Sequence, residues 1–238
     1  MAKRKPASTA RLVVSVAGHF QVGKSTLVNC LLRERVAKCG DSTTPTTARA
    51  QPYPCGQLTL LDTPGINAEE AHTWEMWKGI QRSDLAILVV SSLKELSEPL
   101  KNLLAQIARE RLPLYALVNC WDDKTWNDGD PDAAKDKQVV KAIISQIRER
   151  SKLIGSSIVN LEWAAAARGC LDDEERAEKL ITEYHSGDKD APSSLDVRSG
   201  LLELEKFLFP DPLPAFSPAG LECIVLTSKF IRRLGKES

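Results

Sequence analysis

The stretch Gly18–Thr26 constrains the fold of this chain more than any other segment. It fits the pattern G-x-x-x-x-G-K-[ST] at every fixed position. An apolar, β-branched run at 12–17 precedes it, as in a buried strand, and a helical pattern begins at Lys24. Such a loop binds phosphate where it joins a strand to a helix N-terminus, because backbone N–H groups converge there and the helix dipole favours negative charge. The stretch therefore predicts a site for a nucleoside triphosphate.

Composition and charge narrow the class of protein. The chain has 238 residues and carries 32 basic and 32 acidic side chains, so its formal net charge is zero. From this balance we expect no nucleic acid partner. The longest apolar runs are too short to span a bilayer, and we recognise no signal peptide. The six cysteines lack C-x-x-C pairs and zinc spacing, which indicates free thiols in a reducing cytoplasm.

Strand and helix patterns alternate along the chain. This alternation predicts an α/β fold, a three-layer P-loop domain with a mostly parallel sheet of about six strands. The expected strands are 12–17, 58–61, 85–90, 115–118 and 157–163, with a weaker one at 48–53, and the expected helices are 24–35, 68–82, 98–111, 134–152, 171–184 and 200–209.

Four segments are expected from one end of the chain to the other. Residues 1–10 form a flexible basic tail, and residues 11–209 form the nucleotide-binding domain, with a polar loop at 186–198. Closely spaced prolines predict a stiff linker at 210–219, because proline fixes φ and cannot continue a helix. Residues 220–238 form an amphipathic helix that packs back on the domain, docks into another protein or touches a membrane surface.

A second phosphate-side motif closes the expected strand at 58–61. Asp62-Thr63-Pro64-Gly65 has the form D-x-x-G, in which Asp62 can hold a magnesium-bound water and the Gly65 amide can reach a γ-phosphate. A hydroxyl from the Ser/Thr-rich run 42–47 can complete the Mg²⁺ shell beside Ser25, since Mg²⁺ prefers near-octahedral oxygen ligands.

A third motif, Asn119-Cys120-Trp121-Asp122, fits N-K-x-D with cysteine in the lysine place. Asp122 can accept two hydrogen bonds that guanine donates and adenine cannot, while Asn119 would bridge the base edge and the phosphate loop. Within the alanine run after the expected strand 157–163, the backbone N–H groups of Ala165 and Ala166 would meet the guanine O6. Each motif alone is more often a turn or a helix cap. In this order, each at a strand end, they together favour a guanine nucleotide.

In these residues the chain resembles the P-loop GTPases with Era-like and dynamin-like G domains, and is most similar to bacterial dynamin-like proteins. The likeness covers about 11–209 and rests on G-x-F-x-x-G-K-S-T-x-x-N-x-L-L from Gly18, P-T-T-A at 45–48 and D-T-P-G-I at 62–66. It implies Mg²⁺-dependent binding of GTP and GDP, hydrolysis that is slow without a partner or a dimer, and switches reordered by the γ-phosphate. By position it implies Thr47 as the magnesium ligand of the first switch, with Thr46 as the alternative.

The motifs and the resemblance together define the residues of the expected site. The nucleotide-binding residues are Gly18, Gln21, Val22, Gly23, Lys24, Ser25, Thr26, Asp62, Gly65, Asn119, Asp122, Ala165 and Ala166; the magnesium ligands are Ser25, Thr47 and Asp62; and Lys24, Thr47, Gly65 and Gln21 support catalysis.

Three residues bear on affinity and catalysis. Cys120 replaces the lysine whose stem lies against the base, which predicts weaker affinity. Ile66 follows the D-x-x-G glycine, where some GTPases carry a water-orienting glutamine. Gln21 stands where relatives supply an arginine, a lysine or a monovalent-cation ligand, so it binds K⁺, holds water or simply faces solvent or a neighbouring residue.

We predict a cytoplasmic GTPase that acts as a nucleotide-switched module on a protein partner or through a homodimer of its G domain. Two alternatives stay open. One is a non-catalytic guanine-nucleotide switch, which Cys120, Ile66 and Gln21 allow. The other is an Era-type GTPase associated with the ribosome or RNA, which should carry a basic RNA module that is not visible after residue 209.

Overall fold

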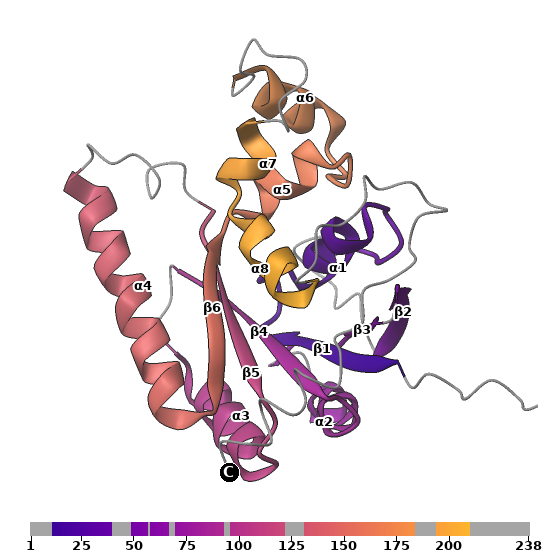
Figure 1. The fold of residues 1–238 in the computed structure, drawn as a ribbon, viewed down its shortest axis with the longest axis vertical. Coiled ribbons are helices and arrows are strands. Elements are labelled where there is room, and N and C mark those ends of the chain that lie inside the picture. Colours follow the sequence, from indigo (N-terminus) through magenta and orange to yellow (C-terminus); the bar gives the residue numbers. More distant parts are fainter. Residues whose placement is uncertain are drawn as a thin grey trace, which may run out of the picture.

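The computed structural model describes residues 11–39, 49–56, 58–66, 70–92, 96–121, 131–183 and 194–209. Six strands form one sheet in the order β2-β3-β1-β4-β5-β6 (Figure 1). All neighbouring strands pair in parallel except β2, which is antiparallel to β3. The predicted α/β fold with a mostly parallel sheet is therefore confirmed.

The elements alternate in chain order. The strands are β1 (Leu12–Gly18), β2 (Gln51–Cys55), β3 (Leu58–Asp62), β4 (Leu85–Ser91), β5 (Leu114–Asn119) and β6 (Leu153–Val159), and the helices are α1 (Lys24–Leu32), α2 (Glu70–Gln81), α3 (Glu98–Arg109), α4 (Pro131–Arg150), α5 (Leu161–Ala167), α6 (Glu174–Glu183), α7 (Ser194–Arg198) and α8 (Leu201–Leu208).

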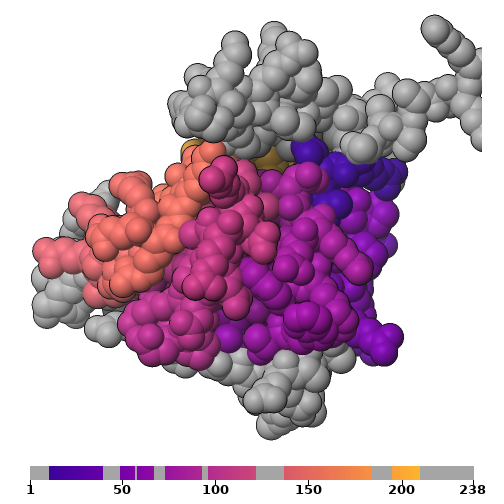
Figure 2. Space-filling view, turned by 90° about the horizontal axis from the view of Figure 1, so that it is seen from below, coloured from indigo at the N-terminus to yellow at the C-terminus, as the bar shows by residue number. Residues whose placement is uncertain are grey.

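Helices cover both faces of the sheet, which explains why its central strands are buried throughout. Alternate residues of a strand point to opposite faces. In β4, Ile87 and Val89 pack with α1 and α8, whereas Leu88 and Val90 pack with α2, α3 and α4. Seen from below, the latter three helices lie next to one another (Figure 2). A smaller core forms between α5, α6 and α7.

The chain departs from the expected elements mainly after β5. β6 begins and ends four residues before the expected strand 157–163, and the helix α5 starts at Leu161. Asn160 ends the strand because its side-chain oxygen accepts a hydrogen bond from the Trp163 amide at 3.0 Å and caps α5. A short helix, α7, also lies within the expected loop 186–198.

Three expected segments, the tail 1–10, the linker 210–219 and the helix 220–238, lie outside the described residues. Among the helices that the structure does describe, none combines the length and the apolar character that a membrane span requires.

A buried arginine joins the helices on one side of the sheet. Arg168, directly after α5, donates to Asp196 of α7 at 2.7 Å and makes two hydrogen bonds to the Glu205 carboxylate of α8, at 2.7 and 3.0 Å. It also donates to the Cys30 carbonyl of α1 at 3.1 Å. Its side chain is only 1% exposed, and it makes the shortest ion pairs of both carboxylates; Arg33 lies farther from Glu205, at 3.9 Å. Buried carboxylates of this kind need a nearby cation.

We expect Arg168→Ala to lower the free energy of unfolding by about 3–5 kcal/mol, because it leaves buried carboxylates without their close cation. Urea unfolding followed by circular dichroism measures this. Lys206→Ala is the matched control, since the Lys206–Glu203 pair is exposed on both sides and should contribute little. Equal effects of the two substitutions would contradict this role of Arg168.

Candidate functional site

The loop between β1 and α1 has the backbone that its glycines require. Gly18 has φ 151°, and an added Cβ would lie 2.2 Å from the Val89 carbonyl oxygen, so no larger residue fits. Gly23 has φ 97° and directly precedes α1, whose N-terminus receives no side-chain cap from the described residues. The first amides of α1 are therefore available to an anion. Gln21 lies at the exposed tip with φ 60°.

Lys24 is a buried cation at the start of this helix. Lys24 is only 7% exposed, and its Nζ donates to the His19 carbonyl oxygen at 2.7 Å. Burial lowers the pKa of Lys24 to about 8, although the nearby Asp62 carboxylate raises it. A phosphate in the loop would supply the negative charge that this buried ammonium group requires.

Two of the three expected magnesium ligands lie together. The Ser25 hydroxyl donates to Oδ2 of Asp62 at 2.8 Å, and Asp62 is 2% exposed at the end of β3. A hydroxyl and a carboxylate side by side at the phosphate loop fit the oxygen-ligand chemistry of Mg²⁺. The third expected ligand, Thr47, lies outside the described residues.

The D-x-x-G segment packs directly on the loop. A Cβ on Gly65 would lie 2.8 Å from both N and Cα of Phe20, so only glycine allows this approach. The Ile66 amide donates to the Gly18 carbonyl at 3.1 Å, and the Thr63 hydroxyl donates to the Val16 carbonyl at 2.7 Å. The two motifs, nearly forty residues apart in sequence, therefore form one surface.

Asn119 links the loop to the third motif. Its fully buried side chain donates from Nδ2 to the Val22 carbonyl at 3.0 Å and accepts from the Leu161 amide at 3.1 Å through Oδ1. The expected contact with the loop is therefore present, while the role of Asn119 toward a base stays a prediction. Asp122, the expected base-reading residue, lies outside the described residues.

The structure corrects the argument for Ala165 and Ala166. Both are buried inside α5 rather than in a loop after β6. In the interior of a helix each N–H is engaged by a carbonyl four residues earlier, so it cannot also face a purine O6. The predicted contact of the Ala165 and Ala166 amides with the guanine O6 therefore does not fit this helix. The residues that follow β6 are Asn160 and Leu161.

The remaining expected loop residues lie in the same region. Val22 is a loop residue with a buried side chain, and the Thr26 hydroxyl in the first turn of α1 lies 3.7 Å from the Cys39 sulfur. Sequence reasoning missed two neighbours of Gly23. A Cβ there would lie 2.7 Å from Cδ1 of Leu161 and 3.7 Å from Cζ2 of Trp121. The variable position of N-x-x-D could have drawn attention to Trp121.

Comparison with known proteins finds GTPases that resemble part of this domain. Residues 13–120 match the model of a family described as 50S ribosome-binding GTPase. GTPase Der from Chlamydia muridarum is 34% identical over 128 residues, which are 48% of this chain and 26% of that protein. GTPase Der from Chlamydia trachomatis serovar L2 is 33% identical over 124 residues, or 47% and 25%. The match thus spans about a quarter of the length of these curated relatives.

Two solved structures share the fold. Era from Aquifex aeolicus bound to GDP and AlF4⁻ superposes with a TM-score of 0.51 at 16% identity, covering 74% of this chain and 57% of that one. Era in complex with MgGDPNP and nucleotides 1506–1542 of 16S ribosomal RNA gives 0.50 at 17%, covering 77% and 60%. With the family match, these findings show that the domain is similar to GTP-binding P-loop domains such as those of Der and Era. The closer likeness to dynamin-like proteins is not confirmed.

The comparisons overturn one prediction about partners. We expected no nucleic acid, yet one Era structure is a complex with ribosomal RNA, and the matched family is described by ribosome binding. A formal net charge of zero therefore does not exclude an RNA partner for such a domain.

Burial of Lys24 predicts a pH-dependent stability in the protein free of nucleotide and Mg²⁺. Below pH 8 the lysine is charged in both folded and unfolded states, and burying the charge costs about 3 kcal/mol. Between about pH 8 and 10.5 the folded state loses its proton first, so this cost shrinks as pH rises. We therefore expect Lys24→Met to raise the free energy of unfolding of the free protein below pH 8, although loss of the hydrogen bond to His19 offsets part of this gain. The difference from the wild type should disappear toward pH 10.5.

Urea unfolding of both proteins at several pH values in EDTA checks this. Lys179→Met, at an exposed lysine of α6, is the control and should show no such trend. A stability difference that stays constant across this pH range would show that Lys24 is not a costly buried cation.

Proposed function

We propose that this chain binds GTP with Mg²⁺, hydrolyses it to GDP and phosphate, and acts as a nucleotide-switched module on a partner. One observation supports this above all. The phosphate loop, the Asp62–Gly65 segment and Asn119 meet at the carboxyl ends of β1, β3 and β5. Ligands of open parallel sheets bind at this edge.

The phosphate end of the site follows from charge and hydrogen-bonding groups. The amides at the start of α1 would receive the β-phosphate, and Lys24 would neutralise the β- and γ-phosphates. The cost of burying that ammonium group without an anion means that binding a triphosphate relieves an unfavourable charge.

Ser25, Asp62 and Thr47 would hold Mg²⁺, Asp62 through a water molecule. The 2.8 Å contact between Ser25 and Asp62 supports the first two. Bound Mg²⁺ supplies charge neutralisation for the transferring phosphoryl group. The amide of Gly65, seated against Phe20, would then detect the γ-phosphate.

The base would be read on the β5 side of the loop. Asp122 would accept hydrogen bonds from the guanine N1 and N2 groups, next to the buried Asn119 that already joins the loop to α5. This placement selects GTP over ATP, since adenine lacks donors at those positions.

Catalysis needs help from outside the described residues. Ile66 is buried and its amide is bound to the Gly18 carbonyl, so it cannot orient a water molecule. Gln21 is exposed at the loop tip, where its amide oxygen can hold K⁺ or water but cannot neutralise charge. We therefore propose slow hydrolysis that K⁺, a second copy of the domain or another protein accelerates, in the cytoplasm.

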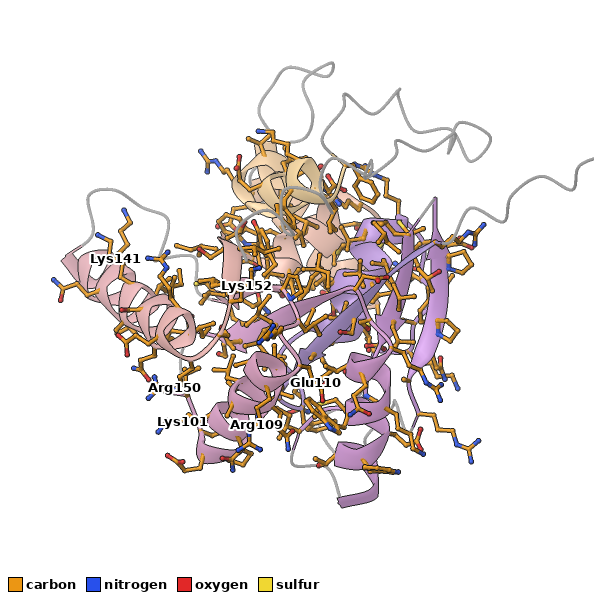
Figure 3. All side chains as sticks on the ribbon, turned by 60° about the horizontal axis from the view of Figure 1, so that its bottom comes forward. Lys101, Arg109, Glu110, Lys141, Arg150 and Lys152 are labelled. Atoms are coloured by element: carbon orange, nitrogen blue, oxygen red, sulfur yellow. The ribbon has the colours of Figure 1, made fainter. Side chains whose placement is uncertain are left out.

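An Era-type function in RNA or ribosome association is the second candidate. It is suggested by the Era complex with ribosomal RNA and by the description of the matched family, and the surface of α3 and α4 favours it. Five basic side chains lie on this layer: Lys101 and Arg109 on α3, Lys141 and Arg150 on α4, and Lys152 after α4, with Glu110 among them (Figure 3). Glu98 and Glu149 pair with Lys101 and Arg150, which leaves an excess of positive charge.

We expect the wild-type protein to release phosphate from GTP and Lys24→Ala to lose at least a hundredfold of that rate, because the transferring phosphoryl group loses its buried cation. Phosphate release is measured in Na⁺ and then in K⁺, at low and high protein concentration. Lys179→Ala is the matched lysine control.

The outcomes separate the alternatives. Faster release in K⁺ that Gln21→Ala abolishes supports the cation role. GTP binding without Lys24-dependent release under any condition would make the chain a non-catalytic switch. Equal affinity for ATP and GTP would refute the guanine site.

For the second candidate, we expect the GTP-loaded protein to cosediment with bacterial ribosomal subunits and to lose this binding as salt rises. Reversing two charges, in Arg109→Glu with Lys141→Glu, should weaken binding and flatten the salt dependence. Lys179→Glu on α6 is the control for a charge change elsewhere. Absence of binding at low salt would remove this candidate.

A further inference from the structure

We propose that the indole of Trp121 forms one wall of the nucleoside site and takes over the contact that the lysine of N-K-x-D would make. This inference rests on the proposed nucleotide site, and it concerns how the nucleoside is held rather than which base is chosen.

Cys120, at the lysine position, cannot contact a nucleoside bound at the phosphate loop. It is fully buried in the core between the sheet and α2, α3 and α4. Its amide donates to the Val159 carbonyl at 2.8 Å, which continues the pairing of β5 with β6. The side chain is thus directed into the core, and a nucleoside held at the loop needs another neighbour.

Trp121 is the next residue, and it lies against the loop. A Cβ on Gly23 would be 3.7 Å from Cζ2 of Trp121, which is van der Waals contact, and 3.1 Å from Nδ2 of Asn119. The indole thus lies next to the last backbone unit before α1. Trp121 is 37% exposed, so part of it remains open to a ligand.

Trp121 is next to both expected ends of the ligand, to one in the structure and to the other in the sequence. The phosphates bind the amides that begin at Gly23, and the base is read at Asp122, the residue after Trp121. A nucleotide whose phosphates bind at Gly23 and whose base is read next to Trp121 in the sequence lies within reach of the indole. An aromatic ring beside a ribose or purine gives stacking contact that the short Cys120 side chain cannot give from the core.

Stacking makes a distinctive prediction about selectivity. Every base offers a π-face, so an aromatic wall strengthens binding without choosing among bases. Trp121 should therefore contribute to the affinity for GDP and for ADP alike, whereas Asp122 should determine the ratio between them. Neither effect should reach inorganic pyrophosphate, which has no nucleoside.

The test is calorimetric titration of the full chain with GDP, ADP and pyrophosphate in Mg²⁺. We expect Trp121→Ala to raise the Kd for GDP by about tenfold or more, with the ratio of ADP to GDP affinity unchanged. Trp121→Phe should restore most of the affinity, since it keeps an aromatic ring. The control is Trp74→Phe, at a tryptophan of α2 that is 58% exposed, and it should bind as the wild type does.

Fluorescence gives a second readout. GDP should change the tryptophan emission of the wild type and of Trp74→Phe, and that change should shrink in Trp121→Phe.

Each result decides between roles. If Trp121→Ala weakens pyrophosphate as much as GDP, the residue supports the loop and the inference is overturned. An unchanged GDP affinity in Trp121→Ala overturns it as well, while leaving the proposed function intact. Failure of the wild type itself to bind GDP would overturn the proposed function and this inference together.

Discussion

The side-chain amide of Asn119 is the contact on which the site's geometry depends. It bonds the phosphate loop at Val22 and the first residue of α5 at Leu161, and it is fully buried. Both partners are backbone groups. Leaving either one buried without a hydrogen bond would lower the free energy of unfolding by about 1–3 kcal/mol. One amide therefore fixes the ends of β5 and β6 relative to the loop, and no residue without both a donor and an acceptor can replace it.

The helix that carries Lys24 and Ser25 is held at both of its ends. At its start the loop is fixed by Asn119, and at its end the carbonyl of Cys30 accepts from Arg168. That arginine also bonds both carboxylates of α7 and α8, so the last described helices are joined to the phosphate-binding helix through buried charge rather than apolar contact alone. Buried charge pairs restrict geometry strongly, because a small displacement exposes an uncompensated charge.

The sheet and the phosphate side of the site could be predicted because spacing and strand ends agree. Asp62 and Gly65 close an apolar strand, and parallel strands bring their carboxyl ends to one edge. The region after β5 could not be predicted equally well. An apolar run such as Leu161–Ala167 reads as strand or helix by hydrophobicity, and the capping hydrogen bond of Asn160 decides for helix. The motif points to Trp121 by sequence, but its contact with Gly23 depends on the path of the folded chain after β5.

Net charge misled the prediction of partners for a physical reason. A formal sum of zero describes the whole chain, whereas association depends on the local field within about a Debye length, roughly 8–10 Å in physiological salt. Arg109 and Lys141 lie on neighbouring helices of one layer, while acids such as Glu205 and Asp196 are buried against Arg168 inside the fold. The formal sum therefore does not describe the α3–α4 layer, where the basic side chains of Figure 3 outnumber the acidic ones.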